Sequence, residues 1–203
     1  SVQIYCDFSG YSDLAIGVAA LMGYELKDNF NFPYQSLNLT EFWHRWHIAL
    51  STWFRDYLYI PLGGNRKGAL RTYLNSFLAM VVAGLWHGAS WIFILWGVLH
   101  GMGLVIHKFC LNNGLNKIPN NTYVKVASWL ITFCYVSFAW IFFRANNIDS
   151  AIELISHIIH ETHLSDAYTF LMSYPVWLLL VLISLELHSI RKTDYDWLQQ
   201  KFI

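Results

Sequence analysis

The sequence predicts an all-α protein whose helices cross a membrane several times. Only 13% of its 203 residues are charged, whereas 56% are hydrophobic and 18% are aromatic. A soluble domain carries about 25% charged residues, so the charge content is roughly half the usual value. Ten tryptophans and twelve tyrosines suit a protein with many helix ends at membrane interfaces. The formal net charge is zero and no basic stripe is present, so we expect no nucleic-acid partner.

Five apolar segments carry the prediction of a polytopic protein. A helix needs about 20 apolar residues to cross a hydrocarbon core roughly 30 Å thick. The apolar stretch over 73–107 is too long for one ordinary span, and the glycines around 84–90 indicate either a junction of two helices or one distorted helix. We interpret residues 1–203 as part of a membrane domain with spans at about 2–24, 73–90, 91–110, 124–143 and 173–189.

Residues 41–59 are too polar to span a membrane and are predicted to form one amphipathic helix in the interface or along a polar cavity. Thr40 is the expected N-cap, and Glu41 lies in the first turn. A second, short amphipathic helix is predicted over 149–160. The apolar side of the first helix comprises Trp43, Trp46, Leu50, Trp53, Phe54 and Tyr57, and its polar side comprises Glu41, His44, Ser51, Thr52 and Arg55, with His47 at the border.

Three cysteines, Cys6, Cys110 and Cys134, are widely spaced in apolar segments. Their odd number and their spacing indicate neither a disulfide framework nor a CxxC metal pair. We expect them to be buried as small hydrophobic side chains.

Two histidines that follow tryptophans are the main candidates for chemistry. His87 lies deep in an apolar stretch between Gly84 and Gly88, and His47 lies in the amphipathic segment. An ionisable group at membrane depth is costly to keep and indicates function, and histidine exchanges protons near neutral pH. A purely structural histidine, hydrogen-bonded between helices that pack closely at the two glycines, is the alternative. Asp7 and Asp13 favour a functional polar interior, because they too lie in an apolar segment.

Other classes of function remain open on the residues alone. His44 and His47 have the spacing of two metal ligands on one helix face. His100 and His107, however, have no neighbouring ligand. We therefore expect no metal site and regard a metal-dependent membrane oxidase as the weaker hypothesis. A non-catalytic transporter or scaffold would use the two aspartates and His87 as pathway residues. Arg55 and its neighbour Asp56 form either an exposed ion pair or a contact that lines a cavity.

Five runs of sequence bear on this choice. The runs are FWHRWHIALSTWFRDYLYIPLGGNR (Phe42–Arg66), YCDFSGYSDLAIG (Tyr5–Gly17), GLWHGASW (Gly84–Trp91), LWGVLHG (Leu95–Gly101) and FFRA (Phe142–Ala145). They resemble the membrane-bound O-acyltransferase family, and in particular its alginate O-acetyltransferase branch. The resemblance is close over about 1–145 and covers two ordered motifs, one of them 25 residues long.

The resemblance implies an enzyme that transfers an acetyl group from an activated thioester, such as acetyl-CoA, to hydroxyls of an exported polysaccharide, with no bound cofactor. D-alanyl transfer to teichoic acid is the related alternative. His87 matches the family's histidine in a membrane tunnel and is the expected general base, and His47 matches its second histidine. The expected substrate-binding residues are Asp7, Asp13, Ser51, Arg55 and Trp86, with Trp86, His47 and Ser51 as candidate donors to the oxyanion.

The resemblance also implies a setting. We expect a multi-pass protein of the bacterial cytoplasmic membrane, in contact with lipid and assisted by an extracytoplasmic acetyltransferase. The family's N-terminal helices are missing from this sequence, so we interpret it as a fragment. The basic residues Arg55, Arg66, Lys67 and Arg71 gather in one flank, which the positive-inside rule assigns to the cytoplasm.

Overall fold

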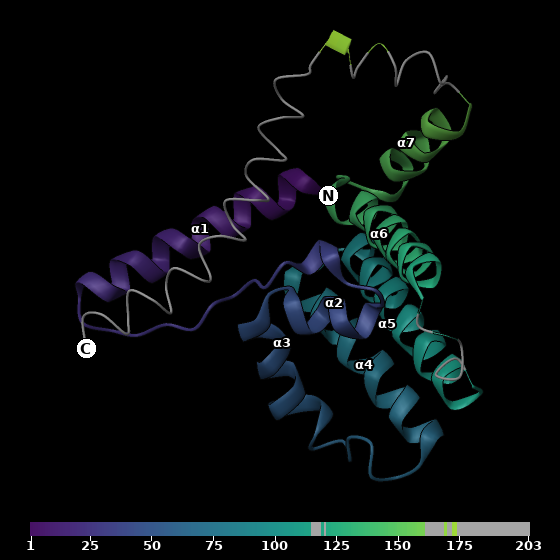
Figure 1. Ribbon diagram of the computed structural model, residues 1–203, viewed down its shortest axis with the longest axis horizontal. Helices are drawn as coiled ribbons and strands as arrows, with labels where there is room; N and C mark the ends of the chain where they lie inside the picture. Colours follow the sequence, from purple (N-terminus) through teal and green to yellow (C-terminus); the bar gives the residue numbers. More distant parts are fainter. Residues whose placement is uncertain (115–118, 120, 161–168, 170–171, 174–203) are drawn as a thin grey trace. The chain divides into compact units, whose positions relative to one another are not determined.

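The computed structural model describes residues 1–114, 119, 121–160, 169 and 172–173. Within these residues the protein is helical and has no strand, which confirms the predicted all-α class (Figure 1). The elements are α1 (Val2–Leu21), the 3₁₀ turn η1 (Pro33–Gln35), α2 (Leu39–Arg45), α3 (Ile48–Phe54), the π turn η2 (Arg55–Tyr59), α4 (Ala69–His87), α5 (Trp91–Asn112), α6 (Thr122–Arg144) and α7 (Ile148–His160).

The chain divides into two compact units, Ser1–Ile152 and Glu153–Ile203. Every site discussed below lies in the first unit. The described part of the second unit begins with the last residues of α7, a helix that confirms the short helix predicted over 149–160.

Three helices of the described chain, α4, α5 and α6, are long and apolar enough to cross a membrane. They coincide with the predicted spans over 73–90, 91–110 and 124–143. Helix α1 was also expected to span, but it is not among the three, because Asp7, Asp13 and two serines lower its hydropathy. The fifth predicted span, 173–189, lies outside the described residues.

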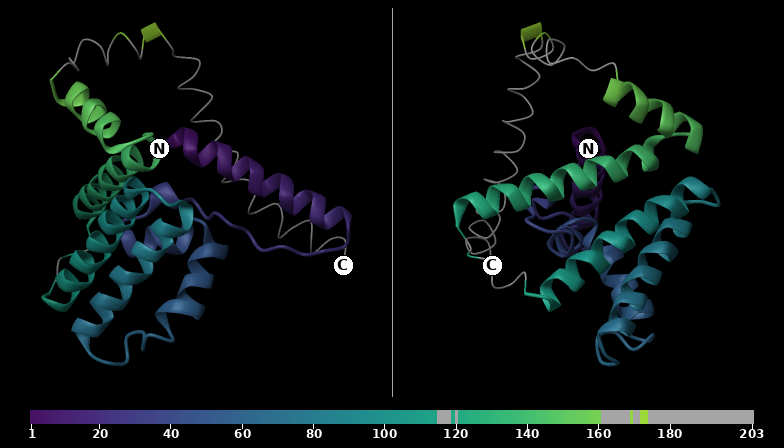
Figure 2. Two further views of the ribbon diagram at one scale, coloured as in Figure 1. Left: turned by 180° about the vertical axis from the view of Figure 1, so that it is seen from behind. Right: turned by 90° about the vertical axis from the view of Figure 1, so that its right-hand side faces the viewer.

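Helices α4 and α5 form an antiparallel hairpin around the break predicted near 84–90 (Figure 2). Glycines let the two backbones approach. A Cβ atom added to Gly84 would lie 2.2 Å from the carbonyl oxygen of Phe93, and one added to Gly97 would lie 2.5 Å from that of Met80. Small residues serve this purpose in membrane helices, where close van der Waals packing replaces the hydrophobic driving force. The hairpin therefore depends on the absence of side chains at these positions.

The single amphipathic helix predicted over 41–59 is wrong. Helix α2 ends at Arg45, Trp46 adopts an extended backbone, and His47 has a φ of 45° before α3 begins. The break turns the second half of segment 41–59 away from the apolar side that the sequence predicts. Trp53 is therefore 52% exposed, although Trp46 is buried. The N-cap is also displaced by two residues: Asn38, not Thr40, accepts the hydrogen bond from the Glu41 amide.

Polar contacts between loops and helices hold the break in place. The amide of Asn31 donates to the Arg45 carbonyl oxygen (2.9 Å), and the amide of Ile48 donates to the Asn29 carbonyl oxygen (2.9 Å). The loop before η1 therefore satisfies backbone groups on both sides of the α2–α3 joint. Without such partners, buried backbone groups at a helix end would destabilise the fold.

The cysteines are free, as expected, but their predicted burial is wrong for two of them. Cys6 and Cys134 are exposed and Cys110 is half-buried. The exposed pair lies on the outer faces of α1 and α6, where apolar surface suits lipid or further protein rather than this core.

The glycine contact predicts a sharp difference between positions. Gly97→Val should destabilise the protein by about 1–3 kcal/mol or more, because the new side chain would overlap the α4 backbone. Gly17→Val is the matched control, since nothing lies within 4 Å of a Cβ atom added there. Thermal unfolding in detergent, followed by size-exclusion chromatography, measures the difference; equal melting temperatures for the two variants would contradict the packing argument.

Candidate active site

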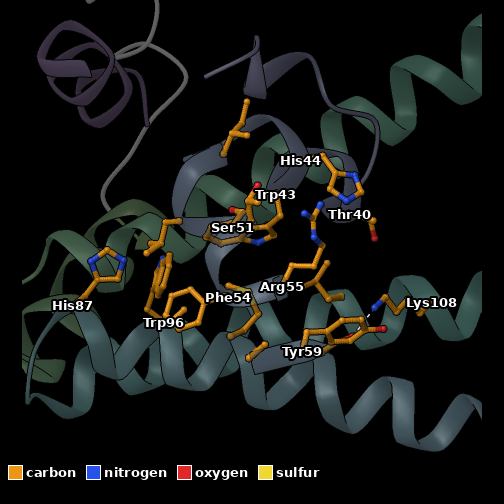
Figure 3. Close-up of a pocket in the computed structure, with 18 residues that line it drawn as sticks. Thr40, Trp43, His44, Ser51, Phe54, Arg55, Tyr59, His87, Trp96 and Lys108 are labelled. Atoms are coloured by element: carbon orange, nitrogen blue, oxygen red, sulfur yellow. Dashed lines mark hydrogen bonds between the residues drawn. The ribbon is translucent and has the colours of Figure 1, made fainter. Parts of the chain in front are cut away.

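A cavity of about 340 Å³ lies between the α4–α5 hairpin and the α2–α3–η2 segment (Figure 3). It follows α4 from Ser76 to His87, which corresponds to about 16 Å at the rise of an α-helix. Its lining is mainly apolar, with polar groups gathered toward the ends. The lining residues are Thr40, Trp43, His44, Ile48, Leu50, Ser51, Thr52, Phe54, Arg55, Tyr59, Ser76, Ala79, Met80, Ala83, His87, Trp96, Leu104 and Lys108.

His87 lies at one end of this pocket, on the last residue of α4. Aromatic rings enclose the imidazole. The ring centroids of Phe143 and Trp96 lie 5.0 and 5.2 Å away, both perpendicular to it, and that of Trp86 lies 4.9 Å away. The glycine break ends the helix here, so His87 lines the cavity as expected.

Trp96 forms the wall between His87 and a second buried histidine. Its side chain is 1% exposed, and its ring centroid lies 4.8 Å from that of His100, which is fully buried. Neither ring nitrogen of His100 has a hydrogen-bond partner in the described residues. A buried polar group without a partner lowers the free energy of unfolding by about 1–3 kcal/mol. The burial of His100 therefore destabilises the fold, and the packing of the surrounding rings offsets this loss.

The opposite end of the pocket is cationic. Lys108 of α5 donates a hydrogen bond to the Ser76 hydroxyl, and its ammonium group lies 5.2 Å from the centroid of the Tyr59 ring. Arg55 lines the same end (Figure 3). Among the ion pairs of the described residues, Arg55 is paired with Asp56, whereas Lys108 takes part in none. The pocket therefore carries a proton-exchanging group at one end and a lysine without a carboxylate at the other.

Ser51, which the sequence predicts to bind substrate, is one of the residues that line the pocket. Its hydroxyl donates to the carbonyl oxygen of Trp46 at 3.1 Å. The hydroxyl hydrogen is therefore already used, and the side chain offers only acceptor lone pairs to a ligand.

His47 does not line the pocket. It occupies the α2–α3 joint, where its Nδ1 lies 3.0 Å from Oδ1 of Asn29 and its ring packs edge-to-face on Phe8 at 4.7 Å. Burial lowers the pKa of His47 to about 4, and the neighbouring His87 shifts it in the same direction. The imidazole is therefore neutral at physiological pH.

Three other predicted site residues lie away from the pocket. Trp86 is 59% exposed. Asp7 and Asp13 lie on α1, and neither lines the cavity. The buried stripe of α1 consists of Tyr5, Ser9 and Ser12, and Asp7 falls about half a helical turn away from it.

No group of three metal-ligating side chains occurs in the part of the chain that the structure describes. The pair His44 and His47 does not share one helix face, because α2 ends between them.

Several residues of the site gave no usable signal in the sequence. Asn29 lies in a polar loop like many other asparagines. Trp96 and Phe54 are two of many aromatic residues in this sequence. Only their tertiary contacts distinguish them from the others. Lys108 is the exception: histidines aside, it is the one charged residue of the apolar helix α5, and that signal was available in the sequence.

Comparison with known proteins decides the family. The model of the MBOAT, or membrane-bound O-acyltransferase, family matches residues 1–152, three-quarters of the chain. The chain belongs to the membrane-bound O-acyltransferase family. With its apolar helices, it is an integral membrane protein.

Three relatives illustrate where this chain stands within the family. It is 46% identical over 159 residues to the peptidoglycan O-acetyltransferase of Helicobacter pylori and 53% identical over 151 residues to the probable alginate O-acetylase of Pseudomonas fluorescens, covering 78% and 74% of this chain. It is 35% identical to the teichoic acid D-alanyltransferase of Streptococcus thermophilus over 70% of this chain. The chain spans 30% of the length of the first two relatives and 38% of the third.

The geometry predicts an order of histidine reactivity toward diethyl pyrocarbonate, which modifies accessible neutral imidazoles. Exposed His44 should react fastest and half-buried His87 more slowly. His100, with no exposed surface, should react only after unfolding. Peptide mass spectrometry after timed exposure measures the three rates; modification of native His100 at the rate of His44 would contradict the packing around Trp96.

Proposed function

We propose that this protein is a membrane O-acyltransferase that transfers an acetyl group from an activated thioester to hydroxyls of an exported polysaccharide. The observation that carries the proposal is a pocket with His87 at one end in a chain of the O-acyltransferase family. Identities of about half to an alginate O-acetylase and a peptidoglycan O-acetyltransferase support acetyl as the group and a glycan as the acceptor.

His87 is the proposed general base. Its imidazole accepts the proton of the attacking hydroxyl as the oxygen bonds to the carbonyl carbon of the thioester. The tetrahedral intermediate collapses, the C–S bond breaks, and the imidazolium returns the proton to the departing thiolate. Positioned proton transfer of this kind contributes about 10²–10⁴-fold to the rate. Aromatic rings pack against part of the half-buried His87 imidazole, which limits the access of water to a thioester bound there.

The oxyanion donors expected from the sequence do not fit this conformation. The Ser51 hydroxyl already donates to a backbone carbonyl, and Trp86 does not line the pocket. His47 bonds to Asn29 through Nδ1 and lies outside the pocket as well. Stabilisation of the oxyanion therefore requires a donor other than these three.

The cationic end of the pocket supports an orientation for the donor. With the thioester carbonyl at His87, a phosphate-bearing donor such as acetyl-CoA places negative charge toward Lys108 and Arg55. An ammonium group in apolar surroundings without a carboxylate partner favours such an anion.

The setting is proposed on the same grounds. We place the protein in the bacterial cytoplasmic membrane, with a polysaccharide acceptor and an extracytoplasmic acetyltransferase that completes delivery. The lower identity to the D-alanyltransferase makes D-alanyl transfer the weaker alternative. A transporter that passes substrate along Asp7 and Asp13 has no support, because neither residue reaches the pocket.

The role of His87 is tested by substitution in the full-length chain. His87→Ala should reduce acetyl transfer by at least about 10²-fold, because the proton acceptor is lost. His160→Ala, at an exposed position on α7, is the control. Transfer is measured with labelled acetyl-CoA and the isolated glycan, and melting temperatures verify folding. Acetylation at the wild-type rate by His87→Ala would contradict the proposed role of His87 as general base.

The orientation of the donor has its own test. Lys108→Met should raise the KM for acetyl-CoA by about 10–100-fold, the loss expected for one charge-assisted hydrogen bond, with little change in kcat. The KM for S-acetyl-N-acetylcysteamine, a thioester without phosphates, should not change. Lys125→Met, at an exposed position on α6, is the matched control. Equal effects on both thioesters would place the anion elsewhere.

A further inference from the structure

Asn29 makes four contacts around His47. Its Oδ1 accepts the amide hydrogen of Ala49 at 3.2 Å and faces His47 Nδ1 at 3.0 Å, while its Nδ2 donates to the Ser12 hydroxyl at 3.4 Å. Its backbone oxygen accepts the amide hydrogen of Ile48. One asparagine of a polar loop thus caps α3 and holds the imidazole at its start.

These contacts determine the protonation pattern of the ring. A backbone N–H can only donate, so the asparagine atom that receives the Ala49 amide must be the oxygen. That same oxygen faces His47 Nδ1, so Nδ1 must carry a hydrogen and donate it. A neutral imidazole has one N–H, and burial keeps His47 neutral at physiological pH. The lone pair therefore lies on Nε2.

The backbone at His47 is held in an uncommon conformation. Its φ of 45° and ψ of 56° lie in the left-handed region, and Phe32 is the only other non-glycine residue with a positive φ in the described chain. Such a conformation is strained for a residue with a side chain and persists only where the surroundings determine it. At His47 the hydrogen bonds of Asn29 hold the backbone in this conformation.

The second ring nitrogen of His47, Nε2, is free to bind a ligand. No hydrogen bond joins His47 Nε2 to another group of the described residues, and it is absent from the buried polar atoms without partners. The ring is half-buried against Phe8. His87 is near enough to influence its ionisation. Nε2 is thus accessible to a ligand, and this ligand approaches from outside the pocket, because His47 does not line it.

We propose that Asn29 is a positioning residue: it holds His47 as the Nδ1–H tautomer, so that His47 offers bound substrate a hydrogen-bond acceptor at Nε2 and not a donor. The group that it recognises is a hydroxyl or N–H of the substrate, for which a glycan acceptor supplies hydroxyls next to the one that reacts. This rests on the proposed function for the identity of the substrate. It replaces the expectation that His47 donates to the oxyanion.

The tautomer is measured directly by NMR on the full-length chain labelled with [¹⁵N]histidine in lipid nanodiscs, with the His47 signals assigned by their loss in His47→Asn. We expect a protonated, pyrrole-type Nδ1 and an unprotonated, pyridine-type Nε2 at neutral pH. In Asn29→Ala the Nε2–H tautomer should gain population, because Nδ1 has lost its acceptor. Asn65→Ala, at an exposed loop position, should leave the His47 signals unchanged.

Asn29→Asp keeps the test usable if Asn29→Ala fails to fold, because a carboxylate still accepts from both the Ala49 amide and Nδ1. It should preserve the Nδ1–H tautomer and raise the pKa of His47. In the transfer assay, Asn29→Ala should lower kcat/KM by about 10–100-fold, as expected when the partner that orients an imidazole is removed, and Asn29→Asp should lower it less.

The outcomes separate this inference from the proposed function. A wild-type spectrum with hydrogen on Nε2, or an Asn29→Ala spectrum identical to wild type, overturns the inference whatever the enzyme does. If the spectra follow the expectation but the protein transfers no acyl group, the tautomer assignment stands and the proposed function fails. If the tautomer is as expected and Asn29→Ala transfers at the wild-type rate, the positioning role is overturned.

Discussion

The close approach of α4 and α5 is the constraint on which the site depends. At Gly84 and Gly97 the two backbones lie nearer than any side chain permits, so the hairpin has one register. That register places Trp96 of α5 against His87 at the end of α4, and the groove follows α4 from His87 back to Ser76, where Lys108 of α5 makes contact. The pocket, which is lined mainly by apolar side chains with a few polar groups, lies beside this contact, and backbone rather than side chains fills the contact.

The α2–α3 segment covers this groove, and it can do so because its helix is broken between α2 and α3. A continuous helix would carry all its large apolar side chains on one side. The break at Trp46 and His47 instead lets the first part bury Phe42 and Trp46 among aromatic rings, while the second part presents Ser51 and Phe54 to the pocket. The loop before η1 stabilises the break with backbone hydrogen bonds, so that a short polar loop determines the shape of a site to which it contributes no lining residue.

The distribution of polar groups gives the pocket a direction. His87 lies at the end where aromatic rings gather, and Lys108 and Arg55 lie at the other. A phosphate-bearing thioester is itself polarised in this way, with a neutral reacting carbonyl and a distant anionic part. Because charge is costly in apolar surroundings, the lysine and the anion each reduce the cost of the other. Family membership and pocket geometry thus support the same chemistry independently.

The sequence by itself determined the helical class, three helices long and apolar enough to cross a membrane, the break near residue 88 and the family, because hydropathy, glycine and motif signals are local and survive without coordinates. The role of His87 stays a prediction. The sequence did not determine the break at His47, the cap at Asn38 or the role of Asn29, because these depend on hydrogen bonds between a loop and a helix joint that periodicity does not encode. Asp7 and Asp13 looked equivalent to the other polar groups in apolar segments; the tertiary structure excluded them from the pocket, because the face that a helix buries is decided by its partners.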